Sequence, residues 1–182
     1  MDAAARWSTR ANALMLARLL LAPALAAALL SGAPALAALL FFVAVGTDFA
    51  DGWVARRYRE ESSFGGFADH AADAIFVVIA TAALARTCVL PAVLPWLIAA
   101  AFIQYALDSR ALSASGLFPS RLGRWNGIAY YVIAAIPIVR DALALDWPGA
   151  ALVSALAWLL IASTIASMVD RLRLLAARRS GR

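Results

Sequence analysis

Lysine is absent from this sequence, cysteine occurs once, and charged residues of both signs make up only 15% of the 182 positions. The single cysteine, Cys88, excludes a disulfide within the chain. The shortage of charge, together with 64% hydrophobic residues and a mean hydropathy of +0.81, excludes an ordinary soluble domain. The composition therefore predicts a multi-pass membrane protein.

Six apolar stretches approach the length of about 20 residues that a bilayer-spanning helix needs. They cover residues 13–30, 33–50, 68–85, 91–107, 127–139 with its flanks, and 147–169. The sequence therefore predicts an all-α fold, an integral membrane bundle of six transmembrane helices that forms one domain over residues 1–182. The polar segment 2–10 contains Trp7 and predicts a short N-terminal juxtamembrane helix, with a frayed terminus as the alternative.

The basic residues, all of them arginine, are distributed unevenly between the two sides of the predicted bundle. Only Arg86 and Arg140 fall on one side, and Arg18 alone lies inside an apolar stretch, so the other side receives the remaining thirteen of 16. The positive-inside rule then places both termini in the cytoplasm. We assign the net charge of +5 to loops that face anionic lipid and not to nucleic acid. The arginine and alanine usage is typical of a GC-rich bacterial genome, which predicts the bacterial inner membrane.

Four aspartates, Asp48, Asp51, Asp69 and Asp73, lie at the facing ends of the second and third apolar stretches. Their spacings of three and four residues place each pair on one face of its helix. An antiparallel pair of helices joined near residue 60 brings all four carboxylates together at the cytoplasmic ends. Like charges repel unless a positive group lies among them, and oxygen-rich clusters suit Mg²⁺ or Mn²⁺. Two such ions would suit displacement at phosphorus.

The residues around the aspartates favour a phosphate-containing ligand. Gly52 and Gly65 allow a ligand to approach the backbone closely. Arg56, one turn beyond Asp51, is placed to meet phosphate oxygens. A single Asp-x-x-Asp can be a capping or interhelical contact, and arginines near a span can be plain positive-inside charge. Two carboxylate pairs with glycines and an arginine interleaved favour a functional site.

The same residues resemble the complete motif of the CDP-alcohol phosphotransferases, also called CDP-alcohol phosphatidyltransferases. The pattern is Asp48-x-x-Asp51-Gly52-x-x-Ala55-Arg56, eight residues, then Gly65-x-x-x-Asp69-x-x-x-Asp73. Asn12-Ala13-Leu14 with Arg18 and Pro23 is similar to the family's first span. Gly123-Arg124-Trp125-Asn126 is similar to its Gly-Lys-x-Lys-Thr stretch, with Arg replacing Lys and Asn replacing Thr. The resemblance covers roughly residues 10–170.

The resemblance implies six transmembrane helices, usually in homodimers, and a site for two Mg²⁺ or Mn²⁺ ions. Asp48, Asp51 and Asp69 would be metal ligands, and Asp73 would be both a ligand and the general base. The donor would be CDP-diacylglycerol or another CDP-alcohol. Its cytidine nucleotide would be accommodated by Gly52, Ala55 and Gly65, with Arg56 near the diphosphate.

The acceptor is less well defined by the sequence. Arg110, Arg121 and Arg124 fall around the loop between the fourth and fifth stretches, where they would hold an anionic acceptor or serve only as positive-inside charge. We favour a polyol phosphate such as glycerol 3-phosphate or inositol phosphate, with serine, a neutral polyol and phosphatidylglycerol left open. Asp108-Ser109-Arg110 departs from the Arg-Glu that glycerophosphate-using relatives often carry, and the role of Asp108 stays open.

His70 follows Asp69 directly and points away from it on a helix, so we expect a packed or interfacial residue and not a ligand. Taken together, the sequence predicts a membrane phosphatidyltransferase of phospholipid synthesis that releases CMP. The rival hypotheses are a small divalent-cation transporter and a membrane scaffold. A transporter requires acids through the membrane depth on several spans, and a scaffold has no need of the interleaved glycines and arginine.

Overall fold

The computed structural model of the protein describes residues 9–58, 63–87, 89–111 and 121–180, with side chains over 15–47, 69–87, 89–107, 122–174 and 176. These residues form six helices, as predicted from the six apolar stretches. The helices are α1 (Thr9–Leu30), α2 (Pro34–Tyr58), α3 (Ser63–Arg86), α4 (Val93–Ala111), α5 (Arg121–Ala142) and α6 (Ala150–Ser180). The predicted juxtamembrane helix over residues 2–10 lies almost wholly outside the described residues.

The turn between α1 and α2 shows how local sequence sets the helix ends. Gly32 has a φ of +70°, a left-handed conformation that glycine adopts without steric cost. The Ala33 amide donates to the Ala28 carbonyl at 2.9 Å, which closes the last turn of α1. Pro34 then starts α2, at a position where a helix needs no backbone donor. The chain therefore reverses within three residues, and α1 and α2 pack as antiparallel neighbours.

Two of the six helices are long and apolar enough to cross a membrane within their described residues, Leu122–Ala142 of α5 and Ala150–Leu174 of α6. Shorter apolar helices cover Met15–Leu30, Pro34–Thr47 and Val93–Leu107. Large apolar side chains on the outer surface, such as Leu20, Trp96 and Leu159, are more than two-thirds exposed, as expected of side chains that face lipid. Membrane-spanning helices are thus present, and the full count of six spans stays a prediction.

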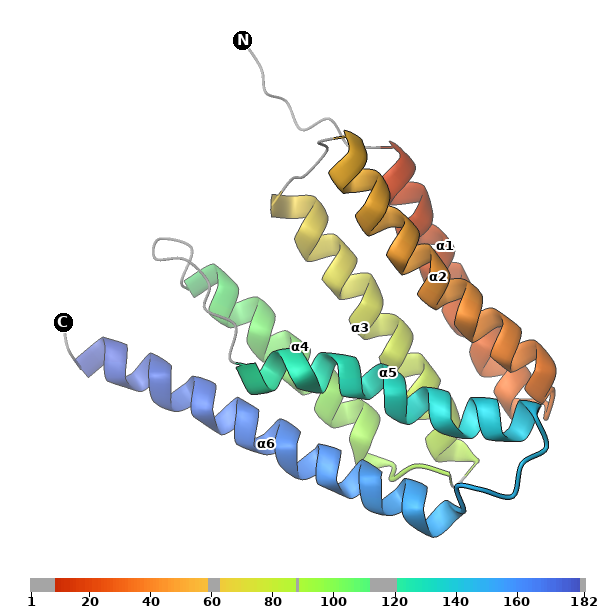
Figure 1. Ribbon diagram of the computed structural model, residues 1–182. Coiled ribbons are helices and arrows are strands. Elements are labelled where there is room, and N and C mark those ends of the chain that lie inside the picture. The colour runs from red at the N-terminus through yellow and green to blue at the C-terminus, as the bar shows by residue number, and fades with distance from the viewer. Residues whose placement is uncertain (1–8, 59–62, 88, 112–120, 181–182) are drawn as a thin grey trace.

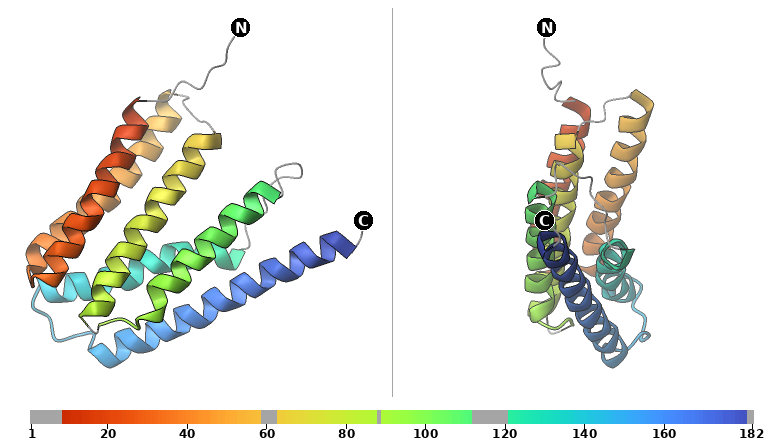
Figure 2. Two further views of the ribbon diagram at one scale, coloured as in Figure 1. Left: turned by 180° about the vertical axis from the view of Figure 1, so that it is seen from behind. Right: turned by 90° about the vertical axis from the view of Figure 1, so that its left-hand side faces the viewer.

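The helices are arranged so that the predicted cytoplasmic ends lie on one side. The beginnings of α1, α3 and α5 and the ends of α2, α4 and α6 point the same way as both termini (Figure 1). Helix α1 packs against α2 and α3, α3 against α4 and α5, α5 against α2 and α6, and α6 against α4. The helices spread apart toward the side of the termini, which the view from behind also shows (Figure 2).

An aromatic cluster fills the space between α2, α3 and α5. Phe41 of α2 lies 6.0 Å from Phe76 of α3 and 6.4 Å from Tyr131 of α5, measured between ring centroids. Phe76 and Tyr131 are stacked at 6.2 Å. Phe41 and Phe76 are buried, so the cluster keeps water away from this part of the bundle. It adjoins the predicted acidic site, because Asp73 precedes Phe76 by less than one helical turn.

Candidate functional site

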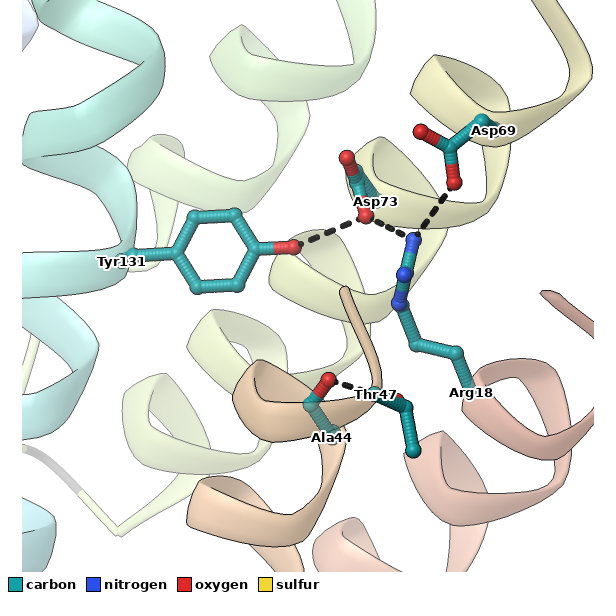
Figure 3. A network of polar contacts seen from close by, with 6 residues as sticks. All are labelled: Arg18, Ala44, Thr47, Asp69, Asp73 and Tyr131. Atoms are coloured by element: carbon teal, nitrogen blue, oxygen red, sulfur yellow. Dashed lines mark hydrogen bonds and ion pairs between the residues drawn. The ribbon is translucent and has the colours of Figure 1, made fainter. Parts of the chain in front are cut away.

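Asp69 and Asp73 lie one turn apart on α3 and face the same partner on α1 (Figure 3). Nη1 of Arg18 donates a hydrogen bond to Oδ1 of Asp69 at 3.0 Å. The same nitrogen forms an ion pair with Oδ1 of Asp73. The i, i+4 spacing on the helix thus aims two carboxylate oxygens at one point in space, as the sequence predicted for this pair.

Arg18 is fully buried, whereas the side chains of Asp69 and Asp73 are 36% and 26% exposed. A buried guanidinium in an apolar bundle is costly unless carboxylates neutralise it. Clustered aspartates repel one another unless a positive group lies among them, and α1 provides such a group for Asp69 and Asp73. The two carboxylates of α3 therefore allow the apolar stretch of α1 to contain the charged Arg18.

Tyr131 of α5 also contacts the acidic pair. Its hydroxyl donates to Oδ1 of Asp73 at 3.2 Å, and its ring is held by stacking on Phe76. Asp73 therefore accepts hydrogen bonds from α1 and from α5. A carboxylate with two fixed donors has a defined orientation, which suits a group that must face a bound molecule.

The other predicted motif residues lie on the expected helices, but their side chains fall outside the described part of the structure. Asp48, Asp51, Gly52, Ala55 and Arg56 belong to α2, and Gly65 belongs to α3. Thr47, next to Asp48, is described and donates from its hydroxyl to the Ala44 carbonyl at 2.7 Å. The convergence of all four carboxylates stays a prediction.

Two of the four predicted metal ligands, Asp69 and Asp73, have described side chains. Among the described side chains, no group of three or more His, Cys, Asp or Glu residues gathers as a metal site, and Asp48 and Asp51 are not among those side chains. The two described carboxylates already converge on a single positive atom, Nη1 of Arg18. Carboxylate oxygens are the ligands that Mg²⁺ and Mn²⁺ prefer. A cation position therefore exists at this point, and a guanidinium holds it.

A cavity of about 460 Å³ opens beside Asp73, between α3, α4, α5 and α6. Asp73 and His70 line it from α3, and Arg124 and Arg171 line it from α5 and α6. Most of the lining residues come from the halves of these helices nearer the two termini, where the helices spread (Figure 1). Asp73, one member of the acidic pair, and two arginines thus share one cavity.

Aromatic contacts fix part of the cavity wall. The guanidinium carbon of Arg171 lies 5.1 Å from the centre of the Tyr105 ring, within the range of a cation–π contact. The exposed His70 ring stacks on Tyr105 at 6.4 Å and 16°. This matches a packed, interfacial histidine, although His70 also lines the cavity. Tyr105 therefore links α3 and α6 beside the site.

The predicted acceptor residues are only partly described. Arg124 lines the cavity and is exposed. Arg110 lies in α4 and Arg121 begins α5, with both side chains outside the described part, as is that of Asp108. Arg171, one of the thirteen arginines assigned to the cytoplasmic side by their charge alone, lines the same cavity as Arg124.

Comparison with known proteins agrees with the motif. A family model described as CDP-alcohol phosphatidyltransferase matches residues 8–169. The CDP-diacylglycerol–glycerol-3-phosphate 3-phosphatidyltransferase of Cereibacter sphaeroides is 34% identical over 105 residues, which are 53% of this chain and 46% of the relative. The protein of the same name from Escherichia coli is 29% identical over 110 residues, 60% of this chain and 58% of the relative.

The aligned parts therefore span about half the length of these two relatives. The family match is much longer, since it runs from the first turn of α1 into α6 and includes Arg18, Asp69, Asp73 and Tyr131. Because the family model matches residues 8–169, most of the chain, this protein belongs to the CDP-alcohol phosphatidyltransferase family.

Proposed function

We propose that this protein is a metal-dependent phosphatidyltransferase of phospholipid synthesis. It transfers the phosphatidyl group of CDP-diacylglycerol to a hydroxyl of a small polyol phosphate, with glycerol 3-phosphate as the favoured acceptor, and releases CMP. The observation that carries the proposal is that Asp73 belongs both to the acidic pair and to the wall of a cavity bearing two arginines. The names of the two relatives support the same donor and acceptor.

The donor side of the site is formed by the family motif. Asp48, Asp51, Asp69 and Asp73 would hold Mg²⁺ or Mn²⁺, two ions in all. When bound, these ions supply positive charge that offsets the developing charge on the departing phosphate. The nucleotide lies against Gly52, Ala55 and Gly65 of α2 and α3, where small residues leave room for it, and Arg56 lies near the diphosphate.

In the transfer step one bond forms, one bond breaks and one proton moves. The acceptor oxygen forms a bond to the phosphorus that carries diacylglycerol, and the bond between that phosphorus and the CMP oxygen breaks. Asp73 takes the hydroxyl proton and later passes it to water. The hydrogen bond from Tyr131 fixes the orientation of the Asp73 carboxylate, which lines the cavity. Reaction therefore requires the acceptor hydroxyl to enter from the cavity side.

The acceptor phosphate is held by arginine. Arg124 and Arg171 line the cavity, and Arg171 is steadied by the Tyr105 ring. The guanidinium group of arginine can bind two phosphate oxygens at once, and it remains charged at any physiological pH. Arg110 and Arg121 would add charge at the same cavity opening. Two arginines in one small cavity favour a phosphorylated acceptor over serine or a neutral polyol.

The family match and the two long apolar helices support a membrane setting. We place the protein in the bacterial inner membrane with both termini in the cytoplasm, as a homodimer in contact with membrane lipids. CDP-diacylglycerol then enters from the bilayer, and its headgroup reaches the site on the side of the termini.

The proposed function is tested with purified protein, CDP-diacylglycerol and a panel of radiolabelled acceptors. We expect label from glycerol 3-phosphate to enter a lipid product with one CMP released for each transfer. Label from serine, inositol or glycerol is expected to stay in the aqueous phase. Transfer to serine or to a neutral polyol at a higher rate would reassign the acceptor while keeping the chemistry.

Substitution of Arg171 tests the acceptor side. Arg171→Gln is expected to raise KM for glycerol 3-phosphate by about 10- to 100-fold, because a charge-assisted hydrogen bond to phosphate is lost. The KM for CDP-diacylglycerol should change by less than about twofold. Arg173→Gln is the matched control, since Arg173 is exposed on the same helix and does not line the cavity. Equal effects of the two variants would argue against an acceptor role for Arg171.

A further inference from the structure

The inner wall of the cavity is polar, although it lies within an apolar bundle. Gln104 of α4, Asn126 of α5, and Thr164 and Ser167 of α6 all line it. Asn126, Thr164 and Ser167 are between 1% and 5% exposed. Polar groups in such surroundings are costly unless each is hydrogen-bonded, so their partners indicate what they are for.

Several of these groups are satisfied within the protein. The Thr164 hydroxyl donates to the Leu160 carbonyl at 2.8 Å and is hydrogen-bonded to Tyr130 at 2.8 Å. The Ser163 hydroxyl donates to Oδ1 of Asn126 at 2.7 Å. Nε2 of Gln104 donates to the Met168 carbonyl at 3.0 Å. Each carboxamide therefore has one end fixed to α6.

The other ends of the two carboxamides are not satisfied. Nδ2 of Asn126 and Oε1 of Gln104 are buried and have no hydrogen-bond partner among the described residues. One is a donor and the other an acceptor. The Ser163 hydroxyl can bond either end of the Asn126 amide, so Asn126 keeps one unused polar atom in either orientation. A buried polar atom left unused in the free protein is costly, and a bound molecule can satisfy it.

We propose that Asn126 and Gln104 select an acceptor that carries, besides the hydroxyl that reacts, at least one further hydroxyl group. The inference rests on the proposed function and names the part of the acceptor that this wall recognises. A hydroxyl group both donates and accepts, and so matches an unused donor and an unused acceptor. With the phosphate at Arg124 and Arg171 and the reacting oxygen at Asp73, the non-reacting hydroxyl is the group left to face the polar wall.

The two polar ends of Asn126 distinguish it from a purely structural residue. A carboxamide has two polar ends, so it can bind Ser163 with one end and a ligand with the other. A purely structural residue here would need only the contact with Ser163. Asn126 is therefore a specificity residue and not a catalytic one.

The test compares glycerol 3-phosphate with 3-hydroxypropyl phosphate, which lacks only the second hydroxyl. The wild-type protein should prefer glycerol 3-phosphate by about tenfold or more in kcat/KM, since a hydroxyl-binding site rejects an analogue that leaves its polar atoms unpaired. Asn126→Leu should lower kcat/KM for glycerol 3-phosphate to about the value for the analogue. Its kcat/KM for the analogue should stay within about twofold of wild type.

Gln104→Leu, on a different helix, should reduce the preference in the same direction and carries the test if Asn126→Leu does not fold. Thr81→Val is the matched control. Thr81 is buried and polar, bonds only its own helix at Val77 and Val78 among the described contacts, and does not line the cavity. Thr81→Val should keep the wild-type preference. Size-exclusion profiles in detergent show which variants fold.

The outcomes separate the inference from the proposed function. Equal use of both phosphates by the wild type overturns the inference and leaves the proposed function standing. An equal loss on both phosphates in Asn126→Leu also overturns it, because a structural defect would not distinguish the two acceptors. Use of neither phosphate, with the phosphatidyl group transferred to serine or a neutral polyol and CMP released, overturns the proposed acceptor instead.

Discussion

Asp73→Asn is expected to lower kcat by about 10²–10⁴-fold or more, while the affinity for CDP-diacylglycerol changes little. The range is what a positioned general base contributes to a reaction, and loss of a metal ligand adds to it. Asparagine keeps the shape of the side chain and an oxygen that accepts from Arg18 and Tyr131, so the fold is expected to survive. Single-turnover CMP release and equilibrium binding of the donor measure the two quantities separately.

The matched control for this variant is Asp141→Asn. Asp141 is also an aspartate on a helix, pairs with Arg140 at 2.7 Å, and lies at the opposite end of α5 from the cavity residues Gly123 and Arg124. The Asp141→Asn variant should have the same kcat as the wild-type protein. Full activity of Asp73→Asn would remove the role assigned to this carboxylate, whatever the control shows.

Arg18→Met is expected to destabilise the metal-free protein more than any other single change discussed here. Removing one partner of a buried ion pair costs about 3–5 kcal/mol, and the partial exposure of Asp69 and Asp73 favours the lower end. For a chain of this size that is a fall in apparent melting temperature of about 6–12 °C in EDTA. Millimolar Mg²⁺ should restore much of the loss, because a divalent ion supplies the charge that the guanidinium provided.

Arg140→Met is the control for this prediction. It also removes an arginine paired with an aspartate, but at the other end of the bundle. Mg²⁺ should raise the apparent melting temperatures of the wild type and of Arg140→Met by similar amounts, both smaller than the increase for Arg18→Met. If Arg18→Met responds to Mg²⁺ no more strongly than they do, then Arg18 does not hold the cation position, and the convergence of Asp69 and Asp73 has only a structural purpose.

The fold was largely predictable because membrane helices leave a strong local signal. Each apolar stretch became part of one helix, since a spanning segment must satisfy its own backbone hydrogen bonds. The ends were harder to place. α2 continues to Tyr58 and α6 to Ser180, beyond the stretches predicted to Ala50 and Val169, because polar residues extend a helix without adding hydrophobicity.

The site was predictable where one helix carries it. The spacing of Asp69 and Asp73 correctly placed both carboxylates on one face. The pairing with Arg18 was missed, although a lone arginine in an apolar run signals a partner elsewhere in the bundle. The polar wall of Gln104 and Asn126 had no local signal. These residues come from two consecutive helices, α4 and α5, and the packing of both helices against α6 brings them into one cavity.

The most direct test of the central claim is CMP release from CDP-diacylglycerol and glycerol 3-phosphate as divalent ions are removed and returned. We predict that EDTA abolishes release and that Mg²⁺ or Mn²⁺ restores it, because the aspartates bind the ions that activate the diphosphate. Undiminished release in excess EDTA would contradict the account.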